Sequence, residues 1–192
     1  MKSSALIAAI AVGALATALA KPSSALPAGW LQAGNPKADC ESSVVIAAGA
    51  PSPKVFNIDC KSGDQGFQTL MQQIAATDYA GKRVRLSAQV RGEKIDGWGG
   101  VWMRSDSGQR TATAFDNMKD RPLTGEFSWK PAEVVLDIPA DATTLSFGFL
   151  LEGSGRLQAT RFQLDVVPNT TPTTGQGSVP PLRRQAQNLT PP

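Results

Sequence analysis

The segment RVRLSAQVR, residues 83–91, alternates strictly between polar and apolar side chains. A period of two is typical of a half-buried antiparallel strand, which places Val84, Leu86, Ala88 and Val90 on one face. Residues 132–139 (AEVVLDIP) and 144–151 (TLSFGFLL) repeat this alternation. Short strands separated by Gly, Pro and Asp predict an all-β fold with little helix, an antiparallel β-sandwich or jelly roll.

One predicted strand breaks the alternation. In residues 155–167 (GRLQATRFQLDVV), Leu157 and Ala159 follow one phase, whereas Phe162 and Leu164 follow the other. One extra residue near positions 160–161 restores the alternation, so the sequence predicts a β-bulge there.

Residues 67–77 (FQTLMQQIAAT) are ambiguous. Phe67, Leu70, Met71 and Ile74 have the spacing of one face of an α-helix. A short apolar run of this length also fits a strand, and periodicity alone does not distinguish the two.

The two ends of the chain differ from its middle. Residues 1–20 combine one lysine, a run of small and apolar residues and a final Ala-Leu-Ala, which is typical of a secretory signal peptide cleaved after Ala20. No later segment approaches the about 18 apolar residues of a membrane span. Residues 168–192, rich in Pro, Thr, Gly and Gln, predict a tail that is mostly disordered or lies over the surface of the domain. We therefore expect a periplasmic or secreted protein with its β-sandwich domain at residues 21–167 and no membrane span after cleavage.

The cysteines are consistent with export. Cys40 and Cys60 are the two cysteines of the chain. In an oxidising compartment a disulfide between them is favoured over two free thiols.

The chain contains no histidine, which excludes Ser-His-Asp and Cys-His catalysis and imidazole metal sites. Two cysteines alone do not make a zinc site, and Asp116, Met118 and Asp120 do not reproduce a calcium loop. We therefore expect no metal or other cofactor. The net charge of +3 is mild and its basic residues are dispersed, so no nucleic-acid partner is expected.

Residues 96–108 (DGWGGVWMRSDSG) hold the best candidates for a ligand site. If Val101 and Met103 face the core, Trp102 and Arg104 share the outer face, where an indole can stack on a sugar and a guanidinium can donate hydrogen bonds. They can equally form a cation–π pair that binds nothing. In the opposite phase Trp102 is a core residue, and Arg104 then requires Asp116 or Asp106 as a partner.

Several segments together resemble a known family. The motifs TLMQQI, YAGKRVRLSAQV, GVWMR and AFDNMKDRPLTG are similar to a bacterial galactose-binding-like, carbohydrate-binding-module-type jelly roll, over roughly residues 54–170. Such modules are sometimes found in proteins described as transcriptional regulators. The resemblance implies that residues 67–75 form a strand. The chain departs from the family's pattern in its last strand, where Gln158, Ala159, Thr160 and Arg161 stand in place of the usual Trp and acidic residues.

Three functions follow as hypotheses. The first is an exported, non-catalytic β-sandwich that binds a carbohydrate or related polar small molecule, with a site formed by Trp102, Arg104, Asp116, Trp98 and Gly148, the glycine leaving room for the ligand. The second is a structural or protein-interaction module of the cell envelope with an envelope protein as partner, marked by a pocketless sandwich in which Arg104 pairs with Asp116. The third is a carboxylate-based glycoside hydrolase, which needs two acids about 5–10 Å apart in one cleft.

Overall fold

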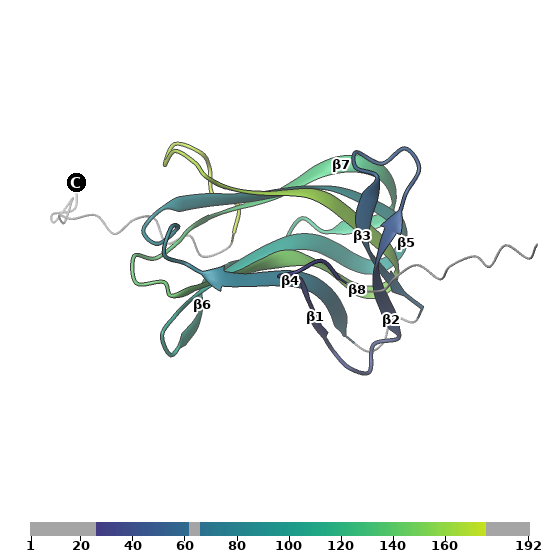
Figure 1. The fold of residues 1–192 in the computed structure, drawn as a ribbon, viewed down its shortest axis with the longest axis horizontal. Coiled ribbons are helices and arrows are strands. Elements are labelled where there is room, and N and C mark those ends of the chain that lie inside the picture. Colours follow the sequence, from purple (N-terminus) through teal and green to yellow (C-terminus); the bar gives the residue numbers. More distant parts are fainter. Residues whose placement is uncertain (1–25, 62–65, 176–192) are drawn as a thin grey trace, which may run out of the picture.

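The computed structural model describes residues 26–61 and 66–175. These residues form strands joined by turns, without a helix, as predicted (Figure 1). All strands belong to one curled antiparallel sheet. The strands are β1 (Leu31–Gly34), β2 (Cys40–Ile46), β3 (Lys54–Cys60), β4 (Phe67–Ala75), β5 (Arg83–Ser107), β6 (Arg110–Asp116), β7 (Leu123–Asp137) and β8 (Thr144–Val166).

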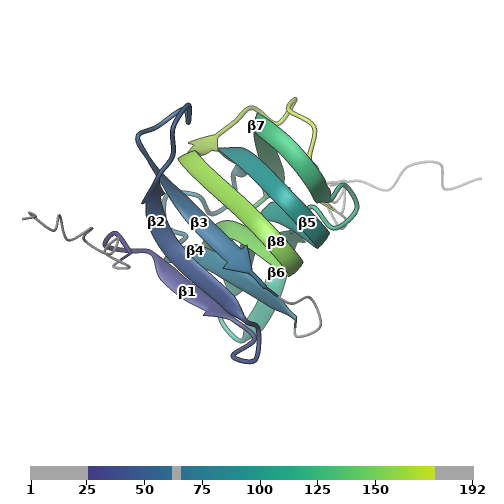
Figure 2. The same cartoon turned by 90° about the vertical axis from the view of Figure 1, so that its right-hand side faces the viewer.

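The sheet folds into two layers because β5 and β8, with 25 and 23 residues, run through both of them. In the first layer the beginning of β5 lies between β7 and the end of β8, and β3 and β2 follow. Figure 2 shows these strands side by side. In the second layer the end of β5 lies between β6 and the beginning of β8, followed by β4 and β1.

The bend between the layers depends on glycine. Gly153 and Gly155 have φ angles of 95° and 108°, and a Cβ at either position would overlap a backbone carbonyl of β5, that of Asp96 or Lys94. Since other residues adopt this conformation only with strain, the two glycines allow β8 to stay paired with β5 through the bend.

The predicted alternation is confirmed. Val84, Leu86, Ala88 and Val90 are buried, as are the apolar positions expected to face inward in residues 132–139 and 144–151. These side chains meet between the layers in one core. Its largest fully buried members include Phe149, Ile58, Leu70, Leu86 and Met103.

The two irregular segments are also resolved. Residues 67–75 are a strand, paired along their whole length with β8, so the strand interpretation is confirmed over the helical spacing. Ser87 pairs with Gln163 and Gln89 with Thr160, which leaves one extra residue on β8. The β-bulge is therefore confirmed, and Arg161 within it has a φ of 53°.

Cys40 and Cys60 lie opposite each other in β2 and β3 and form the expected disulfide. The signal-peptide interpretation concerns residues outside the described part, as does most of the tail. Residues 168–175 of the tail lie against β7, where the Thr174 N–H donates a 3.0 Å hydrogen bond to the Val135 carbonyl. Among the described residues there is no helix long and apolar enough to cross a membrane.

Candidate ligand-binding groove

A groove of about 410 Å³ crosses the outer face of the second layer. It is lined by one residue or more from each of β1, β4, β8, β5 and β6 and by the turn that follows β6. Aromatic and apolar side chains dominate its surface, with a few charged ones. The lining residues are Ala33, Phe67, Thr69, Met71, Trp98, Trp102, Arg104, Phe115, Asn117, Lys119, Leu150 and Glu152.

The alternation of β5 places three of the predicted site residues in this groove. Val101 and Met103 are fully buried in the core, so Trp98, Trp102 and Arg104 lie on the opposite face and line the groove. Of the two phases that the sequence leaves open, the structure has the one with Trp102 outside the core.

Trp102 has a fixed orientation in the groove. Although it is only 8% exposed, its Nε1–H donates a 2.8 Å hydrogen bond to Oγ1 of Thr69 on β4. The Thr69 hydroxyl donates in turn to the carbonyl of Phe149, also at 2.8 Å. Because its one polar group is satisfied, the indole forms a rigid apolar surface across three strands.

Trp98 is half-buried and more accessible than Trp102. Nζ of Lys119 lies 5.8 Å from the centre of its ring, a cation–π distance. The turn that carries Lys119 lies against the sheet because residue 100 is glycine, where a Cβ would come within 2.6 Å of the Asn117 carbonyl oxygen. Gly100 therefore allows this turn to form one wall of the groove beside both tryptophans.

Arg104 is paired with Asp106 two residues along β5. Its Nε and Nη2 donate hydrogen bonds of 3.2 and 2.9 Å to Oδ2 of Asp106, whose Oδ1 accepts the Ala112 N–H at 2.8 Å. The Arg104 side chain remains 37% exposed, and its Nη1 makes no hydrogen bond with a described residue. Asp106 thus orients the guanidinium and leaves part of it available.

Asp116 does not contact Arg104, so of the two partners that the sequence offers for Arg104, Asp106 is correct and Asp116 is wrong. In the ladder between β5 and β6, Asp116 lies opposite Met103, and Phe115 lies opposite Arg104. Residues opposite each other share a face, so Phe115 lines the groove and Asp116 points away from it. Its side chain is only 3% exposed.

The partners of Asp116 come from the following turn and from the tail. Its carboxylate accepts hydrogen bonds from Nη2 of Arg121 at 2.6 Å, from the Thr174 hydroxyl at 2.6 Å and from the Met118 N–H at 2.8 Å. Burial, the largest single influence, lowers the pKa of Arg121. The hydrogen bonds and charges of Asp116 and Asp120 outweigh it, so that the pKa is raised.

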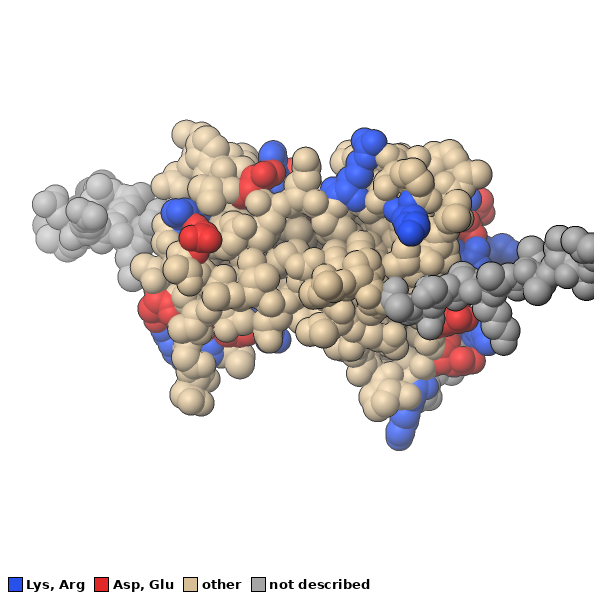
Figure 3. All heavy atoms as spheres, viewed as in Figure 1, with Lys and Arg blue, Asp and Glu red and all other residues tan. Residues whose placement is uncertain are grey.

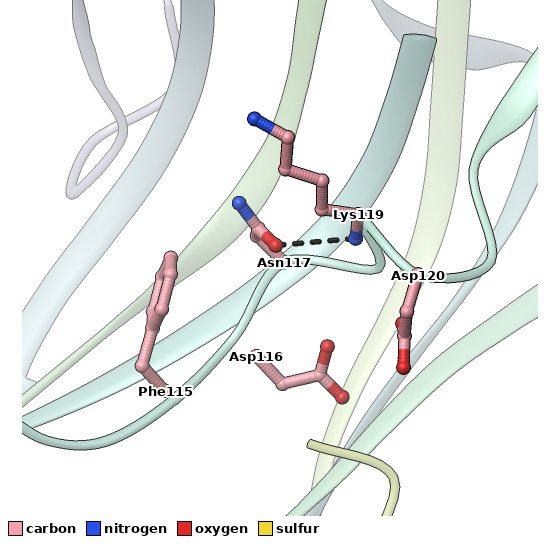
Figure 4. Close-up of a pocket in the computed structure, with 5 residues that line it drawn as sticks. All are labelled: Phe115, Asp116, Asn117, Lys119 and Asp120. Atoms are coloured by element: carbon pink, nitrogen blue, oxygen red, sulfur yellow. Dashed lines mark hydrogen bonds between the residues drawn. The ribbon is translucent and has the colours of Figure 1, made fainter. Parts of the chain in front are cut away.

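A cavity of about 350 Å³ lies beside this cluster and adjoins the groove, with which it shares Phe115, Asn117 and Lys119 (Figure 4). Figure 4 shows Phe115, Asp116, Asn117, Lys119 and Asp120 around it, with the Lys119 N–H donating to Oδ1 of Asn117. Since Arg121 binds both carboxylates, this part of the chain is a charge-compensated connection between β6 and β7.

Gly148 allows close packing within the sheet and does not line the groove. It is buried between Trp102 on β5 and Met71 on β4, and it is not among the lining residues of the groove. A Cβ there would overlap the carbonyl oxygen of Leu70. The space that this glycine leaves is therefore occupied by the backbone of β4.

Sequence reasoning missed the groove residues that come from other strands. Phe67, Thr69 and Met71 share the outer face of β4, which an alternation-based interpretation of residues 67–75 would have shown. Phe67 and Phe115 are each 41% exposed and lie at the groove. Their position depends on long-range strand pairing.

The groove does not contain the pair of acids that a glycoside hydrolase needs. Of its lining residues, all within the described part of the chain, Glu152 is the acidic one. Among the described residues, no group of three or more Cys, Asp or Glu side chains is placed to hold a metal ion.

Charged side chains elsewhere are dispersed. On the face that Figure 3 shows, many lysine and arginine side chains lie near aspartate or glutamate side chains toward the edges, whereas some at the upper right have no acidic side chain beside them, and most of the surface between is uncharged.

Comparison with known proteins gives one partial relative in sequence. No protein-family model matches the chain. The chain is 37% identical over 108 residues to the uncharacterized HTH-type transcriptional regulator YbfP of Bacillus subtilis (strain 168). This match covers 56% of the chain and 37% of the length of YbfP, so the chain corresponds to a limited part of that protein.

Solved structures share the fold at low sequence identity. The CBM22-1 xylan-binding domain of Paenibacillus barcinonensis Xyn10C has a TM-score of 0.51 at 12% identity, covering 72% of the chain and 86% of that domain. The enzymatically active domain of bacteriophage CBA120 tailspike protein 4 has a TM-score of 0.54 at 11% identity, covering 73% of the chain but 20% of that protein. The chain therefore has the jelly-roll-like β-sandwich fold found in carbohydrate-binding modules.

Proposed function

We propose that the protein is an exported, non-catalytic module that binds a carbohydrate in the groove of the second layer. The observation that carries this proposal is the presence of two tryptophans and a partly free arginine on one accessible sheet face. Export rests on the signal-peptide pattern of residues 1–20.

The groove chemistry suits a sugar ring. Trp102 forms a fixed apolar surface, and Trp98, Phe67 and Phe115 add aromatic surface around it. Aromatic rings pack against the C–H faces of sugars, while Arg104, Asn117 and Glu152 can exchange hydrogen bonds with hydroxyl groups. A mostly apolar groove with a few polar groups is the usual composition of a small-molecule site.

The two alternatives receive less support. A purely structural envelope module would have a pocketless sandwich with Arg104 bound to Asp116, and Arg104 instead binds Asp106 beside an open groove. A carboxylate-based hydrolase would need a second acid facing Glu152 across the groove.

A glycan array followed by titration calorimetry on the full chain tests the proposal. We expect Trp98→Ala to weaken binding of the best glycan about fivefold or more, since stacking on one aromatic ring contributes on the order of 1 kcal/mol or more. Trp129→Ala is the matched control, because Trp129 is also half-buried but lies outside the groove. Failure to bind across a broad glycan panel would refute the proposal.

A further inference from the structure

A further cavity, of about 650 Å³, lies on the outer face of the first layer, away from the groove. It is formed where β7, β5 and β8 run side by side (Figure 2). Ser87 lies between Glu133 of β7 and Gln163 of β8, its partners in the two ladders. Ser87 is shorter than the polar side chains of Arg85, Gln89, Glu133 and Gln163, which line the same cavity around it. The rim includes Arg85, Gln89, Glu133, Arg161 and Gln163.

The polar side chains of this cavity have few partners within the protein. Arg161 makes no ion pair with a described residue, and Arg85 has only a 3.6 Å contact with Asp165. Nε of Arg85 is buried and makes no hydrogen bond. Within the described part of the chain, the side chains of Ser87, Gln89, Glu133 and Gln163 also make no hydrogen bond with one another or with other groups.

Arginines elsewhere in the domain behave differently. Arg83, Arg121 and Arg156 each hold a carboxylate at 2.6–2.7 Å. Arg91 and Arg104 do so at 2.8 and 2.9 Å. The unpaired guanidinium of Arg161 and the weakly paired one of Arg85 are therefore unusual for this molecule, and they line the same cavity.

The backbone at Arg161 adds a second, independent observation. Its φ of 53° belongs to the left-handed region, which a residue with a side chain adopts at a cost. It occupies the β-bulge of β8, and bulges redirect side chains beside functional sites. Strained non-glycine residues of this kind concentrate at ligand sites, and here the strain brings a guanidinium to the rim of the cavity.

The combination of charges defines the ligand chemistry. Arg85 and Arg161 carry two positive charges and Glu133 one negative charge, so the lining retains one net positive charge. A guanidinium binds a carboxylate through paired hydrogen bonds, while Glu133 and the two glutamines can bind hydroxyl groups. An inorganic sulfate ion offers no hydroxyl donors to Glu133 and is repelled by it.

We propose that this cavity is a second binding site, specific for a saccharide that carries a carboxylate, a uronic acid unit. Its carboxylate binds between Arg85 and Arg161, and its hydroxyl groups bind Glu133, Gln89 and Gln163. The site lies on the other layer from the groove and does not depend on it.

Titration calorimetry of the full chain with trigalacturonate tests this assignment, with galactotriose and inorganic sulfate as comparison ligands. We expect trigalacturonate to bind more tightly than either at this site, and Arg161→Gln to weaken it about tenfold, because charge-assisted hydrogen bonds are lost. Asp120→Asn, which lies outside both the groove and this cavity, leaves this binding unchanged.

Arg161→Gly separates binding from folding. Glycine adopts the left-handed conformation without strain, so this variant should be at least as stable as the wild type by thermal unfolding and still lose trigalacturonate binding. Three results would overturn the assignment: no binding of trigalacturonate, loss of its binding in Trp98→Ala but not in Arg161→Gln, or equal binding of sulfate. In each of these cases, binding of a neutral glycan that is weakened by Trp98→Ala would still support the proposed carbohydrate site in the groove.

Discussion

Replacement of Asp116 by asparagine should destabilise the fold without weakening carbohydrate binding. The carboxylate is 3% exposed and accepts hydrogen bonds from Arg121, Thr174 and the Met118 N–H. The amide oxygen of asparagine can still accept from Met118. Its NH₂ group, however, faces the Arg121 guanidinium, which is also a donor.

The expected loss of stability in Asp116→Asn follows from these contacts. Breaking a buried ion pair from one side costs about 3–5 kcal/mol, and one hydrogen bond to a charged group contributes about 1.5–3 kcal/mol. The Arg121 side chain is 32% exposed and can recover some hydration in the variant. We therefore expect a loss of about 2–3 kcal/mol in the free energy of unfolding.

Urea unfolding measured by circular dichroism checks this value. With a slope of about 1–3 kcal/mol per molar urea, the midpoint should fall by about 0.7–3 M. Asp120→Asn is the matched control, because this neighbouring carboxylate is 42% exposed and also binds Arg121. Exposed ion pairs of this kind contribute about 0–1 kcal/mol. An unchanged urea midpoint in Asp116→Asn would refute the structural role of this carboxylate. If the variant folds but no longer binds the glycan, Asp116 takes part in glycan binding after all.

Two further substitutions test the sheet itself. Replacing Cys40 and Cys60 by serine opens a loop with a sequence separation of 20. It should lower the free energy of unfolding by about 3 kcal/mol, whereas a reductant should have no further effect on the variant's urea midpoint. Gly148→Ala should lower the free energy of unfolding by about 1–3 kcal/mol, because the added Cβ would overlap the Leu70 carbonyl. A urea midpoint equal to that of the wild type would show that β4 can move away.

Much of the fold is predictable from local patterns in the sequence. The alternation in residues 83–91 and 144–151 identifies both the strands and their buried faces, because successive side chains of a strand point to opposite sides. The shift in phase between Ala159 and Phe162 locates the β-bulge for the same reason. For residues 67–75 the apolar spacing is misleading, since the length of pairing with β8 outweighs a helical pattern of four side chains.

The candidate site is less predictable because it depends on strand register. The sequence groups Trp98, Trp102 and Arg104, which lie on one strand. It cannot place Asp116 opposite Met103 instead of Arg104, although this shift of one residue decides which face the carboxylate occupies. Phe67 and Phe115 come from strands separated by dozens of residues, so only the folded sheet brings them to one groove.

If the groove of the second layer is the carbohydrate site, a bound glycan changes the surroundings of the tryptophans in it. NMR of the indole N–H groups during glycan titration tests this directly, because the chain has four tryptophans at known places in the fold. We expect shifts for Trp98, whose Nε1 has no hydrogen-bond partner among the described residues, and for Trp102. Trp30, which packs on Phe56 and Phe162, and Trp129 should not shift. Shifts confined to Trp30 or Trp129, with Trp98 and Trp102 unchanged in the presence of a bound glycan, would contradict it.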